Sequence, residues 1–455
     1  MRFFREREEF VLAALLLSSL ALVTPRIAES DAVQYFSYLP SIVFDNDVNF
    51  ENEYRRFYDE DSKGRERFKE TFLDRTTVTG LKLNFGPIGS ALLWSPFYIG
   101  AHGILKVSEL FGVDVVADGM SQPYRTAVAF ASALYGAIGL FLSYRLARRF
   151  ASSSTAFIAV VTLWWASPVA YYMYIAPGMS HAPSLFTVSV FFSLWPWVIQ
   201  SSSMGRWAVW GASAGLMTLV REQDLFFAAA VVVPLFLCRK EPLQALKKIA
   251  LFVTTALLVF CPQLVVYETL YGRPLPAPSI QNKMSWFSWH FFDVLFSFEH
   301  GLFFWSPLLF VFALGGFVLL KRDRRAGMFL LIAMVAQVYI SGAVDSWTQA
   351  GAFGSRRFVG ATILFVIWGG SVLTFVERYL RRGAVIVIAS GFILWNVGLM
   401  MQFGLGLMNR DRLIWSEVVH NQIYEVPPRM FSVVGRYFLS RDDLAGSARD
   451  EEGGR

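Results

Sequence analysis

The feature that most restricts this chain is a succession of apolar runs long enough to cross a lipid bilayer. A membrane-spanning helix needs roughly 20 mostly apolar residues, and such runs recur along most of the 455-residue sequence. Only 17% of the residues are charged, against about 25% in a typical soluble protein. We therefore expect an all-α polytopic membrane protein with about eleven transmembrane helices. The candidate spans are residues 9–24, 126–144, 154–174, 183–199, 207–220, 225–238, 249–269, 301–320, 327–344, 358–376 and 384–404.

The distribution of Lys and Arg predicts how these spans are oriented. One more apolar segment, 87–111, is long enough to cross. If it lies flat on the membrane, the basic loops between later spans share a side with Arg2, Arg5 and Arg7. If it crosses, those loops move to the opposite side. Because basic loops favour the cytoplasmic side, we interpret 87–111 as a juxtamembrane helix and place the N-terminus in the cytoplasm.

Residues 1–24 could alternatively be a cleaved signal peptide. Acidic residues are mixed with the arginines before the apolar run, and no small-residue cleavage site precedes Thr24 and Pro25. These features favour a first transmembrane helix.

This orientation predicts a single membrane domain over residues 1–430. It has external loops at 25–125, 271–300 and 345–357, and residues 431–455 form an interfacial segment and a disordered polar tail. The internal loops are short, and no Walker A or Rossmann glycine pattern is present. ATP-driven transport by this chain alone and nucleotide-sugar chemistry in a soluble domain are therefore disfavoured. The net charge of +6 comes from loops between spans, so it does not indicate a nucleic-acid partner.

Acidic residues gather early in the first external loop. Glu29 and Asp31 follow the first span directly, where partial burial could raise a carboxyl pKa into the range of a general base. The alternative is a pair of solvated loop acids. Asp45 and Asp47 could bind a divalent cation, or they could simply form an acidic turn. We expect no required cofactor, with a divalent metal as an open possibility.

Four further polar residues are candidate ligands for an anionic substrate, each with a simpler structural alternative. Lys82 could meet a lipid headgroup or extend to the membrane surface. His181 could bind substrate or pack at the interface. Arg221 could bind an anion or pair with the adjacent Glu222. Lys283 lies among aromatic residues typical of a surface-lying segment or of a sugar- or lipid-binding surface.

The pair Arg356 and Arg357 directly precedes an apolar span. Arginines at a helix N-terminus oppose the helix dipole, and on the external side they also run against the positive-inside preference. An anion held between their side chains and free backbone N–H groups would compensate both costs. We interpret this pair as a phosphate site; the alternative is a pair that contacts lipid headgroups.

Five phrases of the sequence share a pattern with a known family: SDAVQYFSYLPSIVFDNDVNFENEY, NFGPIGSALLWSPFY, SHAPSLF, HGLFFWSPLL and SWTQAGAFGSRRF. Together they resemble the GT-C glycosyltransferases. The similarity is strongest to the protein O-mannosyltransferase and lipid A aminoarabinose transferase branch, in its bacterial family 39-like members. The resemblance covers roughly residues 5–430 and implies that residues 1–430 form a GT-C-like membrane domain.

The resemblance implies an inverting transfer of a sugar from a polyprenyl-phosphate carrier to an acceptor outside the cytoplasm. In that scheme Asp31 is the general base and Glu29 assists it. Lys82 and one of Arg356 and Arg357 contact the donor phosphate, and His181 and Lys283 correspond less closely. The chain departs from the branch in two places: Ala32 follows Asp31 in place of a Glu, and Lys82-Leu-Asn-Phe-Gly-Pro replaces His/Lys-Pro-Pro-Leu.

Other functions remain open at this point. A lipid or solute transporter or flippase predicts charges deep within spans, whereas here they lie near span ends. A non-catalytic binder of lipid-linked sugars would look the same in sequence. The expected partners are a polyprenyl-phosphate-linked sugar donor, a lipid, glycan or protein acceptor, and membrane lipids. The expected location is the bacterial cytoplasmic membrane with the active site external.

Overall fold

The computed structural model describes residues 7–60, 66–201, 203–237, 241–288 and 290–439. Within these ranges the chain is helical, and the only β-pairings are two isolated bridges, from Thr76 to Lys82 and from Met284 to Val344. The all-α architecture is therefore confirmed. The predicted roles of Arg2 and Arg5, and most of the predicted polar tail, concern residues outside the described ranges.

Several of the helices could cross a membrane. Five are both long and apolar enough: α6 (Gln122–Ala147), α8 (His181–Ile199), α11 (Pro242–Tyr271), α16 (Arg324–Gly342) and α18 (Arg382–Gly404). Two shorter apolar helices are α7 (Ser153–Trp165) and α17 (Thr362–Val376). The other predicted spans correspond to α1 (Arg7–Ser18), α9 (Met204–Val220), α10 (Val232–Leu237) and α15 (Pro307–Arg322). These helices support an integral membrane protein, while the number of eleven spans stays a prediction.

The remaining helical segments are short connections or loop elements. In the first loop they are α2 (Ser30–Pro40), α3 (Glu51–Glu60), α4 (Glu66–Phe68) and α5 (Gly89–Leu110). Later come α12 (Pro278–Gln281), α13 (Phe291–Phe296), α14 (Leu302–Trp305), α19 (Trp415–His420) and α20 (Val426–Leu439). Short segments of 3₁₀- or π-helix, wound more tightly or more widely than an α-helix, occupy Ser19–Leu22, Ser41–Asp45, Lys69–Leu73, Tyr171–Ile175, Glu222–Val231, Arg356–Phe358 and Asn421–Glu425.

Helices α1 and α6 run antiparallel. Near the start of α1, Glu9 pairs with Arg148 just after α6, at 3.0 Å. Beyond the other end of α1, the Pro25 carbonyl accepts a hydrogen bond of 2.6 Å from Gln122, the first residue of α6. Residues 25–121 therefore begin and end at the same end of the bundle. The juxtamembrane interpretation of 87–111, which corresponds to α5, stays a prediction.

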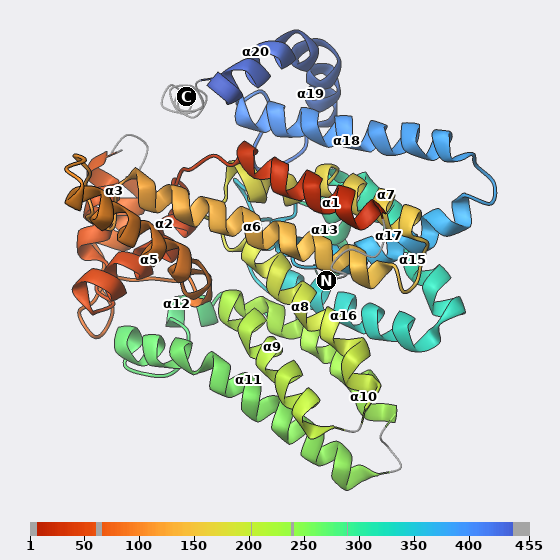
Figure 1. Cartoon of the computed structure of the whole chain (residues 1–455), viewed down its shortest axis with the longest axis horizontal. Coiled ribbons are helices and arrows are strands. Elements are labelled where there is room, and N and C mark those ends of the chain that lie inside the picture. The colour runs from red at the N-terminus through yellow and green to blue at the C-terminus, as the bar shows by residue number, and fades with distance from the viewer. Residues whose placement is uncertain (1–6, 61–65, 202, 238–240, 289, 440–455) are drawn as a thin grey trace.

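We call this the loop end and the opposite one the basic end. In Figure 1 the loop end, with α2, α3, α5 and α12, lies at the left. At the basic end Arg322 donates to the Phe150 carbonyl at 2.8 Å. There the last residue of α15 meets the loop that follows α6, close to the Glu9–Arg148 pair.

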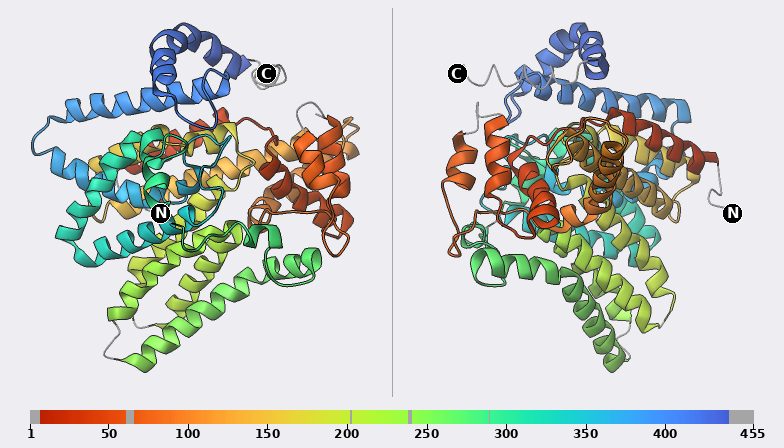
Figure 2. Two further views of the ribbon diagram at one scale, coloured as in Figure 1. Left: turned by 180° about the vertical axis from the view of Figure 1, so that it is seen from behind. Right: turned by 60° about the vertical axis from the view of Figure 1, so that its left-hand side comes forward.

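Three layers make up the helical body. The two further views in Figure 2 agree with Figure 1 that α18 to α20 lie along one edge and α9 to α11 along the other, with α6 to α8 and α15 to α17 between them. Small residues permit close packing: a Cβ added at Gly315 of α15 would lie 1.9 Å from the carbonyl oxygen of Trp368 in α17. Such contacts between backbones are typical of membrane helix pairs.

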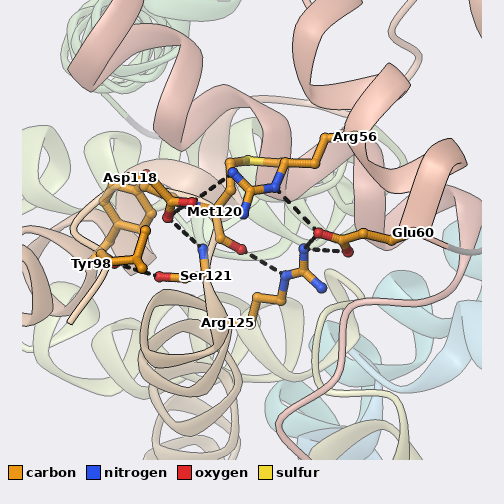
Figure 3. Close-up of polar contacts among 9 residues, drawn as sticks. Arg56, Glu60, Tyr98, Asp118, Met120, Ser121 and Arg125 are labelled. Carbon is orange, nitrogen blue, oxygen red and sulfur yellow. Dashed lines mark hydrogen bonds and ion pairs between the residues drawn. The ribbon is translucent and has the colours of Figure 1, made fainter. Parts of the chain in front are cut away.

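An ion-pair network fastens the first loop to α6 (Figure 3). Arg56 of α3 pairs with Asp118 at 2.6 Å, and Arg125 of α6 pairs with Glu60 of α3 at 2.7 Å. Arg56 also contacts Glu60 at 3.2 Å. Backbone N–H groups of the next turn and Arg56 lower the pKa of Asp118, against the opposing effect of its partial burial. The network holds α3 beside the start of α6.

Candidate functional site

The central feature of the loop end is an ion pair between the loop at residues 25–125 and the loop at residues 345–357. Arg356 donates to Asp31 at 3.0 Å, across 325 residues of sequence. Asp31 lies in the first turn of α2, and Arg356 opens the short turn that precedes α17. Both side chains are partly exposed, 44% for Asp31 and 29% for Arg356. The two residues that the sequence singled out most strongly are thus in contact.

Arg221 joins this site from the end of α9. It donates to the Ser180 hydroxyl at 2.9 Å, and its guanidinium lies 3.2 Å from Nδ1 of His181. The hydroxyls of Ser180 and Tyr35 are 3.1 Å apart, and Tyr35 is one helical turn beyond Asp31 on α2. Arg221 therefore has neutral polar partners, and among the described contacts Glu222, its expected alternative partner, is absent.

These contacts define the protonation of His181. A guanidinium has only N–H donors, so Nδ1 of His181 must accept and the ring proton must be on Nε2. The side chain is 1% exposed, and within the described residues Nε2 has no hydrogen-bond partner. His181 is therefore a neutral N–H donor beside Arg221, and a general base is the role it suits least.

Arg357 is held by backbone groups and contacts no acid within the described residues. Its guanidinium donates to the carbonyl oxygens of Ser341 and Ser346, each at 3.0 Å. Burial, together with the charges of Arg356 and Arg221, lowers the pKa of Arg357 to about 9, so the group remains positive at neutral pH. Three guanidiniums thus influence one another near Asp31, and an anion would relieve their repulsion.

Burial and charge act in opposite directions on Arg356. Burial lowers its pKa, but the nearby carboxylate of Asp31 outweighs this effect and raises the pKa above its ordinary value. Arg356 is therefore a permanent cation that could exchange one anionic partner for another.

Glu29 lies immediately before α2, in the N-cap position with extended backbone. Its charge and that of Arg356 both act on the hydroxyl of Tyr171. Glu29 thus belongs to the same neighbourhood as the Asp31–Arg356 pair.

Two predicted site residues lie elsewhere in the loop end. Lys82 donates to the Leu73 carbonyl at 2.6 Å and is 3.9 Å from Glu51. Lys283 is exposed, on a segment whose backbone bonds to Asp345. No described contact joins either lysine to Asp31 or Arg356, so their roles in binding stay predictions.

The acids of the Asp45 turn are bonded to their own loop. Asp47 accepts from the Ser41 hydroxyl at 2.8 Å, and Asp45 accepts from the Asn52 amide at 2.8 Å. Among the described residues no three His, Cys, Asp or Glu side chains converge as metal ligands. The described side chains therefore do not form a set of ligands for the divalent metal that the sequence analysis kept as a possibility.

Sequence reasoning did not identify Tyr35 or Ser180. Tyr35 could have been flagged, because a residue four positions after Asp31 on a helix lies on the same face. Ser180 had no such signal beyond its position next to His181.

Part of the chain matches a known family. Residues 121–266, about a third of the sequence, match the family described as dolichyl-phosphate-mannose-protein mannosyltransferase. The match supports membership of the GT-C superfamily of membrane glycosyltransferases. It includes Ser180, His181 and Arg221, whereas Asp31 and Arg356 lie outside it. At a general level this family supports a membrane glycosyltransferase that uses polyprenyl-phosphate-linked sugars. No curated protein matches the chain.

Proposed function

We propose that the chain transfers a sugar from a polyprenyl-phosphate-linked donor to a hydroxyl group of a lipid, glycan or protein acceptor. The reaction takes place at the loop end, on the extracytoplasmic face of the bacterial cytoplasmic membrane. The observation that carries this proposal is the contact between Asp31 and Arg356. It brings a candidate base within 3.0 Å of a candidate phosphate ligand.

The chemistry assigns a role to each side of that pair. Asp31 takes the proton from the acceptor hydroxyl, and the hydroxyl oxygen attacks the anomeric carbon as the bond from that carbon to the phosphate oxygen breaks. The electron pair of that bond leaves with the polyprenyl phosphate. Arg356, with Arg221 and Arg357 nearby, stabilises the charge that develops there. Attack opposite the leaving group inverts the anomeric configuration.

The other site residues supply binding. Neutral His181 offers its Nε2 proton to a donor oxygen, and Glu29 orients the acceptor. Arg221 keeps His181 in this tautomer through the contact at Nδ1. None of these residues needs a metal ion for its role.

Transfer of isotope-labelled sugar in proteoliposomes tests the proposal. Asp31→Asn removes the base but keeps the shape, so we expect transfer to fall at least about 100-fold, the lower end of typical general-base contributions. Asp59→Asn, an exposed change in the same loop, is the matched control and should behave like wild type. Both variants should insert and purify normally.

Other outcomes would redirect the assignment. If Asp31→Asn transfers sugar as fast as wild type, Asp31 is not the base. If the wild type transfers sugar from no polyprenyl-phosphate donor, a transporter or a non-catalytic binder of lipid-linked sugars becomes the better explanation.

A further inference from the structure

Gln349 has an unusual backbone conformation for its residue type. It belongs to the loop at residues 345–357, which carries Arg356, and its φ of +53° lies in the left-handed region that is costly for a residue with a Cβ. Glutamine lacks the short side chain with which Asn and Asp offset that cost. Its side chain is also only 5% exposed, although glutamine usually lies at the surface. Both features require compensating interactions in the folded loop.

The side-chain amide of Gln349 bonds to the residues on both sides of Arg356. The backbone N–H of Arg357 donates to its Oε1 at 3.1 Å, and its Nε2 donates to the Ser355 hydroxyl at 3.2 Å. Because a backbone N–H can only donate, the amide oxygen must face Arg357 and the amide nitrogen must face Ser355. The side chain therefore spans the one residue whose guanidinium contacts Asp31.

The backbone around Gln349 is held as well. Its N–H donates to the Ser346 carbonyl at 3.1 Å, and its own carbonyl accepts from the Ala352 N–H at 3.0 Å. The carbonyl of Ala352 in turn accepts a hydrogen bond of 2.8 Å from Nε2 of His300, a side chain that is 2% exposed. The first half of the loop is thus anchored to a neighbouring segment, and the Gln349 amide connects this anchored half to residues 355–357.

We propose that Gln349 is a positioning residue that holds Arg356 for the phosphate of the lipid-linked donor, an inference that rests on the proposed function. The left-handed turn directs the Gln349 amide back toward the backbone on both sides of Arg356. An arginine held in this way loses little conformational freedom when it binds an anion, whereas an arginine on a loose loop must first be ordered, which weakens binding. Gln349 itself needs no contact with the donor.

Binding of a short-chain polyprenyl phosphate to the purified full-length protein tests this role. Gln349→Met keeps the side-chain length but removes both hydrogen bonds, and we expect it to weaken binding about tenfold. Gln349→Gly also removes the amide but relieves the left-handed backbone, so its Tm should exceed that of Gln349→Met while its binding is equally weak. Gly351→Ala is the control: Gly351 has φ of +75° and open space around an added Cβ, so this variant should lower the Tm and bind as wild type does.

A double variant shows whether Gln349 acts through Arg356. If it does, Gln349→Met combined with Arg356→Gln should bind no more weakly than Arg356→Gln alone. Additive losses would overturn the inference, and so would wild-type affinity in Gln349→Met alongside weak binding by Arg356→Gln. Affinity that simply follows Tm, with Gly351→Ala also weak, would reduce Gln349 to a stabiliser of the loop and overturn its positioning role. If the wild type does not bind polyprenyl phosphate at all, the proposed function fails and the inference fails with it.

Discussion

Glu53 shows how burial controls charge in the first loop. Its side chain is 1% exposed, and burial raises its pKa to about 8, with a further contribution from the charges of Asp45 and Asp47. In the unfolded chain the same group titrates near 4.5. Between these values the folded protein holds a proton that the unfolded chain releases. Stability therefore falls as pH rises from about 4.5 to about 8 and levels off above that.

Glu53→Gln should remove this pH dependence, because glutamine resembles the neutral acid and does not titrate. We expect the variant to match wild type in acid and to be more stable by about 1–2 kcal/mol at high pH. The difference is smaller than the whole pKa shift would give, because the structure around a charged Glu53 can relax. Thermal unfolding in detergent at pH values below and above the two pKa values measures the difference. Glu70→Gln, an exposed change in the same loop, is the control. Parallel pH profiles for Glu53→Gln and wild type would contradict the assignment.

The sequence predicted part of the site because some residues are unusual for their position. Arg356 stands before an apolar span on the side that the sequence predicts to be external, and Asp31 follows the first predicted span. Tyr35 is not unusual for its position in the sequence, and only the contact of its hydroxyl in the structure connects it to the site. Lys82 is the opposite case. The sequence proposed it as a phosphate ligand, but its amino group donates to the carbonyl of Leu73, a contact that no sequence pattern indicates.

At the scale of the element, the pairing of α9 with α11 depends on two glycines. A Cβ at Gly211 would lie 2.2 Å from the Phe252 carbonyl, and one at Gly215 would lie 2.3 Å from the Ala256 carbonyl. The spacing of four residues places both on one face of α9. Since both obstacles are backbone atoms, they cannot move aside as a flexible side chain can.

Gly211→Ala should therefore destabilise the protein although alanine favours helices. We expect a loss of about 1–3 kcal/mol from overpacking, seen as a lower Tm in detergent. Gly205→Ala in the same helix meets only the end of Ser203, at 3.7 Å, and should be neutral or slightly stabilising. Equal Tm values for the two variants would argue against close packing of α9 on α11.

Apolar runs predicted where helices occur better than where they stop. The run 154–174 suggested one span, but α7 ends at Trp165 and a separate turn follows at Tyr171–Ile175. The amide of Asn396 in α18 donates to the carbonyls of Trp165 and Ser167, at 2.8 and 3.1 Å. A broken helix is tolerated in a membrane when another group satisfies its backbone. The partner here is 229 residues away, so hydropathy could not reveal it.

At the scale of the whole molecule, the first loop forms part of the site only if it stays fastened to the bundle. The network of Arg56, Glu60, Asp118 and Arg125 provides one attachment (Figure 3). A second attachment is α20, whose Tyr437 lies 3.2 Å from the Thr24 hydroxyl, at the end of the first span. Exposed apolar side chains on α20 include Phe431 and Leu439, and the interfacial role of this segment stays a prediction.

Glu60→Gln should loosen α3 from α6 because the Glu60 carboxylate forms ion pairs with both Arg56 and Arg125. We expect local stability to fall by about 1 kcal/mol at low salt, and by less at high salt, where charges are screened. Hydrogen exchange of the α3 amides is the measurement, and faster exchange is the expected result. Arg55→Gln, which breaks only the pair with Glu51 inside α3, should leave exchange at the α3–α6 contact unchanged. A salt-independent effect of Glu60→Gln would contradict an electrostatic attachment.

The pair of Asp31 and Arg356 also bears on the order of events in a catalytic cycle. Asp31 and Arg356 lie 3.0 Å apart and neutralise each other, so under the proposed function the base and the phosphate ligand are each other's partners. A phosphate that binds Arg356 competes with the carboxylate and frees it. Donor loading would then be the step that switches on the base, and an acceptor arriving first would meet a masked carboxylate. Under the proposed function this leads to a compulsory-order mechanism with the lipid-linked sugar as the leading substrate.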